Sequence, residues 1–268
     1  MSEKKKPRLG EESGHDGIRR IATFIDLTRL NDDQAKDDSD EVIKICKRAR
    51  AYDVAAVCVF PQYVTLARDQ LEGTRVKIAT VQNFPSGNDD LSTVLEGIRT
   101  SRRYGADEVD VVIPYIKLID GKVDECREFL LQVRRVATEN NLVLKIIIES
   151  GMLVDARLIS QAAQLCVEGK VDFIKTSTGK TKVSATREAA EVILKVIEPA
   201  REVCGMKVSG GIRKVEDAQM YLQLCEDVFG DKLSPKNFRI GASGLLDDIE
   251  TRLAAVDGPK TDAVNSTY

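Results

Sequence analysis

The chain has 268 residues, of which 43% are hydrophobic and 31% charged, and its formal net charge is −3. This length suits one large domain, and α/β barrels commonly reach it. No apolar run approaches the ~20 residues of a membrane helix, and the interspersed charges form no basic stripe for nucleic acid. The first residues lack the apolar segment of a secretory signal. We therefore expect a cytoplasmic protein with no membrane or nucleic-acid partner.

Cysteine and histidine, which many catalytic and metal sites require, do not occur in the patterns of such sites. The six cysteines are scattered without a Cys-x-x-Cys pair, which is typical of reduced thiols. The single histidine, His15, belongs to a polar leader, residues 1–20, which we expect to be flexible or a loosely attached first turn, and we place His15 outside every regular element. Ser-His-Asp and Cys-His mechanisms and imidazole zinc sites need a histidine in the folded body. Acid and base chemistry is therefore left to lysine, carboxylate, tyrosine or water, and we expect no metal.

After the leader, strand-like segments alternate with helical patterns. The expected strands cover residues 21–26, 55–60, 76–81, 108–113, 142–149, 171–175, 206–209 and 237–241. The expected helices begin near residues 31, 61, 88, 124, 155, 186, 215 and 244. Eight such units predict an α/β protein with a closed (β/α)8 barrel, a TIM barrel, as a single domain over residues 21–257. A doubly wound open sheet is the alternative, but no Gly-x-Gly-x-x-Gly follows the first strand. The polar residues 258–268 are expected to form a tail.

Polar side chains lie in or directly after several expected strands, and the strands of a barrel end at one common mouth. These candidate site residues are Asp26, Thr28, Asp110, Lys145, Lys175 and Lys207. Because a buried charge without a partner is costly, we expect Asp110 and Lys145 to pair. The alternative interpretations are a purely structural ion pair for these two and, for Lys175, a lysine that extends out of a strand end into water.

Lys175 and Lys207 lie on neighbouring expected strands. Two ammonium groups held close together repel each other, and the repulsion lowers the pKa of one of them. A free lysine is neutral in only about one molecule in two thousand at pH 7, so a lysine that attacks a carbonyl group needs a lowered pKa. The two lysines together therefore predict Schiff-base chemistry.

Glycine-rich loops follow the last three expected strands and lead into helices. They contain Gly179, Lys180, Gly210, Gly211, Gly241, Ser243 and Gly244. Backbone amides at a helix entrance, with the helix dipole behind them, form the usual phosphate site of such barrels. A single Gly-Gly pair is more often a plain tight turn, but glycine-rich loops after both of the last two strands favour a phosphate site.

Five motifs in this order resemble the deoxyribose-phosphate aldolase family. They are Ile25-Asp-Leu-Thr-x-Leu-Asn31, Asn83-Phe-Pro-x-Gly-Asn-Asp-Asp90, Gly105-Ala-Asp-Glu-Val-Asp-Val-Val112, Phe173-Ile-Lys-Thr-Ser-Thr-Gly-Lys180 and Lys207-x-Ser-Gly-Gly-Ile-Arg213. The resemblance implies a class I aldolase that reversibly cleaves 2-deoxy-D-ribose 5-phosphate to D-glyceraldehyde 3-phosphate and acetaldehyde, in the breakdown of deoxyribose phosphate. It implies a covalent lysine imine with no cofactor, small phosphosugar and acetaldehyde partners, and a homodimer.

The resemblance also implies roles for individual residues. Lys175 would form the Schiff base, Lys207 would perturb it, and Asp110 would take part in proton relay. The terminal Tyr268 would help to move a proton at the enamine carbon; a tail that contacts nothing is the alternative. The substrate and its phosphate group would be bound by Asp26, Thr28, Lys145, Thr178, Gly179, Lys180, Gly210, Gly211, Gly241, Ser243 and Gly244.

Two positions depart from the family's pattern. Gly244 stands where a second serine is common, which removes a hydroxyl contact with the phosphate but keeps the amide, and Val208 replaces a frequent Ala or Pro. Two other functions remain as alternatives: another phosphosugar lyase or transaldolase on the same barrel, and a catalytically inactive barrel that serves as a phosphosugar-binding or scaffold protein. The five ordered motifs argue against the first, and intact Lys175, Lys207 and Asp110 argue against the second.

Overall fold

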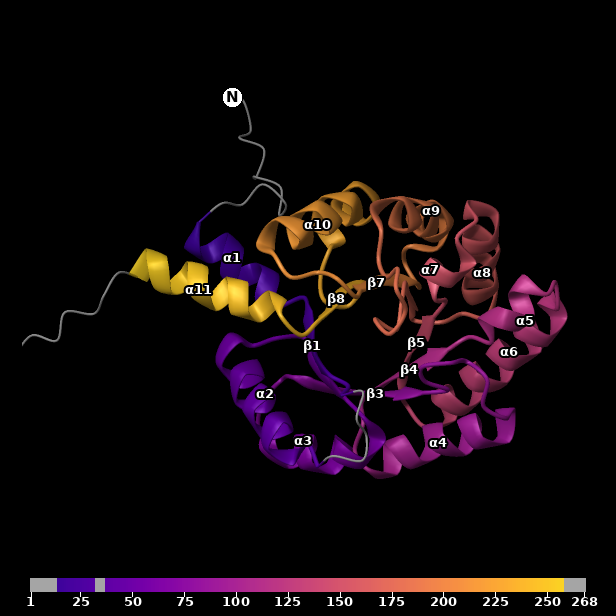
Figure 1. Cartoon of the computed structure of the whole chain (residues 1–268), viewed down its shortest axis with the longest axis horizontal. Helices are drawn as coiled ribbons and strands as arrows, with labels where there is room; N and C mark the ends of the chain where they lie inside the picture. The colour runs from indigo at the N-terminus through magenta and orange to yellow at the C-terminus, as the bar shows by residue number, and fades with distance from the viewer. Residues whose placement is uncertain (1–13, 32–36, 258–268) are drawn as a thin grey trace, which may run out of the picture.

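The computed structural model describes residues 14–31 and 37–257, and its strands close into a barrel (Figure 1). Each strand pairs in parallel with the next, and the last pairs with the first. The strands are β1 (Ile25–Arg29), β2 (Ala56–Val59), β3 (Lys77–Gln82), β4 (Glu108–Val112), β5 (Val143–Ile147), β6 (Phe173–Lys175), β7 (Gly205–Ser209) and β8 (Phe238–Ala242). The predicted single-domain (β/α)8 barrel is confirmed, and the open sheet is excluded.

Helices surround the barrel (Figure 1). Those between successive strands and after the last are α2 (Ser39–Tyr52), α3 (Val64–Gln70), α4 (Leu91–Arg103), α6 (Val123–Glu139), α8 (Ala156–Glu168), α9 (Arg187–Ile197), α10 (Val215–Phe229) and α11 (Leu245–Asp257). Two short helices, α5 (Tyr115–Ile119) and α7 (Ser150–Leu153), follow the ends of β4 and β5. Within the described residues no helix is long and apolar enough to span a bilayer.

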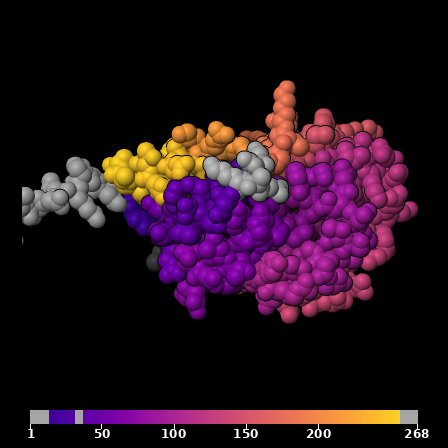
Figure 2. All heavy atoms as spheres, turned by 60° about the horizontal axis from the view of Figure 1, so that its bottom comes forward, coloured from indigo at the N-terminus to yellow at the C-terminus, as the bar shows by residue number. Residues whose placement is uncertain are grey.

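The N-terminal part of the fold differs from the expectation. A helix, α1 (His15–Ala22), precedes β1 and packs beside α11 at one end of the molecule (Figures 1 and 2). Its Ile18, Ile21 and Ala22 are buried at the i, i+3, i+4 spacing of one helix face. The prediction that His15 lies outside regular structure is wrong, and the first strand begins at Ile25 rather than at residue 21. The glycines and charges around His15 obscured this short apolar face.

The helix after β1 begins later than expected, at Ser39 instead of near residue 31. Arg29 donates two hydrogen bonds, at 2.6 and 2.7 Å, to the carboxylate of Asp38, the residue before this helix. This ion pair ties the helix entrance to the strand end. Residues 1–13 of the expected leader, and the expected tail 258–268 with Tyr268, lie outside the described residues.

The strand register divides the barrel interior into an apolar half and a charged half. Side chains alternate between the two faces of a strand, so residues paired across strands share a face. On β2 and β3 the buried residues of the inner face are apolar, with Ala56, Cys58, Ala79 and Val81 in a small core of their own. From β4 round to β1 the same face carries Glu108, Asp110, Lys145, Lys175, Lys207, Arg239 and Asp26. The candidate site is built on this charged half.

Candidate active site

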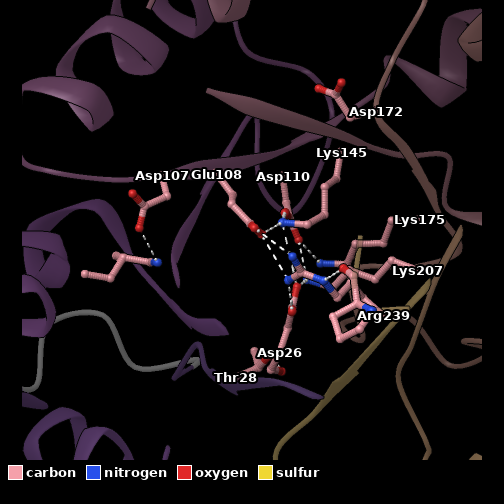
Figure 3. A network of polar contacts seen from close by, with 12 residues as sticks. Asp26, Thr28, Asp107, Glu108, Asp110, Lys145, Asp172, Lys175, Lys207 and Arg239 are labelled. Carbon is pink, nitrogen blue, oxygen red and sulfur yellow. Dashed lines mark hydrogen bonds and ion pairs between the residues drawn. The ribbon is translucent and has the colours of Figure 1, made fainter. Parts of the chain in front are cut away.

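Asp110, on β4, lies at the centre of a buried ion-pair network (Figure 3). Its Oδ2 atom accepts hydrogen bonds from Lys175 Nζ at 2.9 Å and from Lys207 Nζ at 2.7 Å. Its Oδ1 atom accepts one from Lys145 Nζ at 2.9 Å. All four residues are at most 3% exposed. The expected pairing of Asp110 with Lys145 is confirmed, and the same carboxylate also joins the lysines of β6 and β7.

Three more buried charged residues, Asp26, Glu108 and Arg239, extend this network. Asp26 Oδ2 lies 2.6 Å from Lys207 Nζ, and Asp26 Oδ1 accepts a hydrogen bond from Arg239 at 2.7 Å. Glu108 accepts a hydrogen bond from Arg239 at 2.9 Å and lies 2.5 Å from Lys145 Nζ. Each buried charge therefore has at least one partner of opposite sign, as a charge in a low-dielectric interior requires.

The network contains three carboxylates and four basic side chains, so it carries an excess positive charge when every group is ionised. Burial alone would lower the pKa of Lys207, but Asp110 and Asp26 raise it far above its ordinary value. Burial also lowers the pKa of Lys175; Asp110 opposes this effect, Lys207 adds to it, and the pKa remains lowered. Loss of the Lys175 proton balances the charges of the network.

The lowered pKa of Lys175 agrees in direction with the expectation from two adjacent lysines, but its largest cause differs. Removal of Lys175 from water contributes most, and repulsion by Lys207 contributes less. Burial alone would raise the pKa of Asp110, but the three lysines hold it well below the ordinary value. Asp110 therefore remains ionised. The carboxylate of Asp110 thus lies between an amine whose pKa is lowered and one whose pKa is raised.

A cavity of about 290 Å³ opens at the carboxyl-terminal ends of the strands, above the network. Its wall includes Thr28, Lys175, Thr178, Gly179, Lys180, Ser209, Gly210, Gly211, Gly241 and Ser243. Of the four basic side chains in the network, Lys175 lines this cavity, and the other three lie beneath it. A small ligand in the cavity therefore meets the amine whose pKa is lowered.

Several positions at the cavity require glycine, because of either their backbone conformation or the lack of space for a side chain. Gly179, Gly210 and Gly211 have φ values of +80°, +86° and +82°, a region that side chains rarely adopt. A Cβ atom on Gly210 would clash with Ser184, so the loops after β6 and β7 approach each other closely. A Cβ atom on Gly241 would come within 3.0 Å of Lys207 Cε. These glycines line the cavity without side chains, and Gly241 leaves room for Lys207.

The structure brings most of the expected site residues together. Thr28 lines the cavity, and its hydroxyl donates a hydrogen bond to the Asp26 carbonyl at 2.9 Å. Lys180 also lines it, and its Nζ donates to the Leu30 carbonyl at 2.7 Å, so this side chain bridges the loops after β6 and β1. Lys145 is buried under the cavity and does not line it.

Gly244 is not part of the cavity wall either: its position faces Asp247 and Arg213. The expected amide contact of Gly244 with a phosphate group therefore has no support from the cavity geometry. The expected role of Tyr268 concerns a residue outside the described part of the chain.

Two members of the network, Glu108 and Arg239, were missed from the sequence. Each lies two positions before an expected site residue on the same strand, Asp110 and Gly241 respectively, and therefore faces the same side. The alternation of side chains along a strand could therefore have identified both residues from the sequence. A third missed residue, Glu149, follows β5 and bonds the loop after β6.

The fold and the site define a (β/α)8-barrel protein with a buried lysine of lowered pKa at the carboxyl-terminal mouth of its barrel. The family model of DeoC/LacD family aldolases matches residues 20–245. The chain belongs to this family of aldolases.

Solved structures agree with this assignment. A protein from Coccidioides immitis described as a deoxyribose-phosphate aldolase is 27% identical, with a TM-score of 0.77 over 92% of this chain and 90% of that one. An aldolase named QR15 is also 27% identical, with a TM-score of 0.74 over 87% of this chain and 96% of that one. The deoxyribose phosphate aldolase of Aeropyrum pernix, reported as a tetramer, has the same fold, with 23% identity and a TM-score of 0.74 over 89% and 93% of the two chains.

Proposed function

We propose that this chain is a class I aldolase that reversibly cleaves 2-deoxy-D-ribose 5-phosphate to D-glyceraldehyde 3-phosphate and acetaldehyde through a Schiff base on Lys175. The observation that carries the proposal is the position of Lys175: its amine has a lowered pKa, contacts Asp110, and lines the cavity. A lowered pKa increases the fraction of neutral amine, which is the form that attacks an aldehyde in imine formation.

The reaction begins when the Lys175 amine attacks C1 of the open-chain sugar. The resulting carbinolamine loses water, and its hydroxyl needs a proton in order to leave. Asp110 Oδ2 accepts hydrogen bonds from both Lys175 and Lys207, so this carboxylate can take up and return the proton that Lys175 loses. The product is a protonated imine between Lys175 and C1.

Bond cleavage then releases the phosphorylated product. A base, for which a water beside Asp110 is the candidate, removes the proton of the 3-hydroxyl group, the C2–C3 bond breaks, and its electron pair moves to the imine nitrogen. D-Glyceraldehyde 3-phosphate leaves, and an enamine stays on Lys175. Protonation of the enamine at C2 and hydrolysis of the imine release acetaldehyde and restore the amine. The role of Tyr268 in the proton transfer at C2 stays a prediction.

The phosphate group is assigned to the side of the cavity with the three left-handed glycines. Gly179 and Lys180 approach it from the loop after β6, Gly210 and Gly211 from the loop after β7, and Ser243 from the loop after β8. Backbone amides, the ammonium of Lys180 and a hydroxyl group suit a dianionic ligand. The absence of a cofactor and the assembly into a homodimer remain part of the proposal without a residue-level argument.

The proposal is tested with purified protein and 2-deoxyribose 5-phosphate. We expect acetaldehyde and D-glyceraldehyde 3-phosphate to appear in equal amounts, and we expect the activity to be lost when borohydride is added together with acetaldehyde. Borohydride alone should leave the activity intact, because there is no imine to reduce. Failure to release acetaldehyde, or equal inactivation with and without acetaldehyde, would contradict the proposal.

A further inference from the structure

Glu149 is a buried carboxylate that the catalytic steps above do not use. It follows β5, is fully buried, and has a left-handed backbone with φ of 51° and ψ of 59°. This conformation is uncommon for a residue with a side chain, and such residues cluster at functional sites. The backbone on both sides is held by β6, because Ile148 donates to the Lys175 carbonyl at 3.0 Å and Ser150 donates to the Thr176 carbonyl at 2.8 Å.

The carboxylate of Glu149 accepts hydrogen bonds from the loop after β6. Its Oε2 atom accepts one from the Thr178 amide at 3.2 Å and one from the Thr178 hydroxyl at 2.5 Å. The Thr181 hydroxyl lies 3.3 Å from its Oε1 atom. Burial raises the pKa of Glu149, while the bonds from Thr178 and Thr181 and the charge of Lys175 oppose the rise. Among the described residues this carboxylate has hydrogen-bond donors from one loop and no ion pair, so its contacts fix that loop.

The hydrogen bonds continue from Glu149 to the cavity wall. The Thr178 hydroxyl donates its hydrogen to Glu149, so the lone pairs of Thr178 Oγ1 are left to accept a hydrogen bond. The Lys180 amide donates to this Oγ1 atom at 3.1 Å. Thr178, Gly179 and Lys180 all line the cavity. The Glu149 carboxylate itself is not part of that wall. Its contacts therefore set the shape of the turn that carries Gly179 and Lys180.

We propose that Glu149 is a positioning residue that holds the Thr178–Lys180 turn in the shape that binds the phosphate group of the substrate. The inference rests on the proposed function for the identity of the substrate, but its physical content is a phosphate site. The carboxylate acts through Thr178, whose hydroxyl and amide it fixes. Its removal should weaken binding of the phosphate group and leave the chemistry at Lys175 unchanged.

The test compares Glu149→Gln with the unsubstituted protein. Glutamine keeps the size of the side chain, but its amide group turns a donor toward the donors of the loop. We expect inorganic phosphate, titrated by calorimetry, to bind about tenfold more weakly, the change typical of losing one hydrogen bond to a charged group. KM for 2-deoxyribose 5-phosphate should rise by a similar factor with kcat retained, and activity toward unphosphorylated deoxyribose should not change.

Further variants separate positioning from general stability. Thr178→Val removes the hydroxyl, and in the double variant with Glu149→Gln the losses should not add, because both substitutions break one chain of contacts. Thr178→Ser keeps the hydroxyl and should restore most of the affinity. Glu188→Gln is the matched control, because Glu188 is an exposed glutamate in the first turn of α9. It should bind phosphate as the unsubstituted protein does.

Unchanged phosphate affinity in Glu149→Gln, additive losses in the double variant, or equal loss of kcat on both substrates would overturn the inference. So would the absence of phosphate binding by the unsubstituted protein. The outcome is independent of the proposed reaction. Even a protein that fails to cleave 2-deoxyribose 5-phosphate reports on Glu149 through the phosphate titration.

Discussion

Lys207 Nζ lies 2.6 Å from Asp26 Oδ2, in a contact that crosses the barrel interior between β7 and β1. Both side chains are fully buried. Burial alone would raise the pKa of Asp26, but Lys207 and Arg239 lower it well below the ordinary value. Asp110 and Asp26 in turn raise the pKa of Lys207 above its ordinary value against the effect of burial. Lys207 is therefore a fixed positive charge beside Lys175, and it does not share the role of nucleophile.

Replacement of Lys207 tests this electrostatic role. Lys207→Leu removes a positive charge that lowers the pKa of Lys175, so that pKa should rise and the neutral fraction of the amine should fall. We expect imine formation at pH 7 to slow by roughly tenfold for each unit of rise, and its pH profile to move to higher pH. The measurement is the rate of borohydride trapping with acetaldehyde between pH 6 and 10.

The same substitution leaves two carboxylates short of a partner, and the free energy of unfolding should fall by about 3–5 kcal/mol. Lys195→Leu, at an exposed position of α9, is the control for loss of a lysine. A trapping profile in Lys207→Leu that overlies the profile of the unsubstituted protein would remove Lys207 from this role.

Asp26 should make the stability of the fold depend on acid pH. Its pKa is lowered from an ordinary value of 3.8, so its contribution to stability is present above about pH 4 and is lost as the pH falls below that value. Asp26→Asn should lower the free energy of unfolding at pH 7 by on the order of 2 kcal/mol and flatten its decrease below about pH 4. Urea unfolding at a series of pH values measures both effects.

The exposed Asp231→Asn variant provides the comparison for this series. It should unfold with the pH dependence of the unsubstituted protein. An Asp26→Asn variant that loses stability toward acid as steeply as the unsubstituted protein would show that other carboxylates dominate the acid unfolding.

Much of the fold and part of the site could be predicted from the sequence. The spacing of the strand and helix patterns defines eight βα units, and only a closed barrel brings all their strand ends to one mouth. Asp110, Lys145, Lys175 and Lys207 stand out because each interrupts a buried apolar strand. The pairing of Asp110 with Lys145 follows from their positions on adjacent strands.

The rest depends on geometry that a linear pattern does not contain. Arg239 contacts Asp26 and Glu108, and Glu108 lies 131 positions away from it in sequence, so their partnership depends on barrel closure. Glu149 contacts Thr178 because its own backbone is left-handed. In the sequence alone, it looks like any other polar residue that follows a strand. Burial, the largest cause of the lowered pKa of Lys175, requires the whole packed interior.

A carboxylate at Gly211 tests the assignment of the phosphate site. Gly211 has no atom within 4 Å of its Cβ position, so Gly211→Asp should place a negative charge at the cavity without a steric clash. KM for 2-deoxyribose 5-phosphate should rise by about 100-fold or more through like-charge repulsion, and turnover of unphosphorylated deoxyribose should change little. Steady-state kinetics on the two substrates measure the difference.

Gly121→Asp is the matched control for this variant. Gly121 also has a positive φ, +79°, with no atom within 4 Å, and it does not line the cavity. It should carry the same backbone strain, about 1 kcal/mol, without any effect on KM. Equal losses on both substrates in Gly211→Asp would mean that the loop supports the barrel and does not bind phosphate.

The proposed reaction depends on formation of the imine at Lys175. Lys175→Arg keeps a positive charge but cannot form an imine at accessible pH, whereas Lys182→Arg changes an exposed lysine of the same loop and should have no effect. The most direct measurement is mass mapping of the peptides after borohydride reduction in the presence of acetaldehyde. We predict one added ethyl group on Lys175 in the unsubstituted protein and in Lys182→Arg, and no added group in Lys175→Arg. An ethyl group on Lys207 or Lys145, or undiminished labelling of Lys175→Arg, would contradict the account.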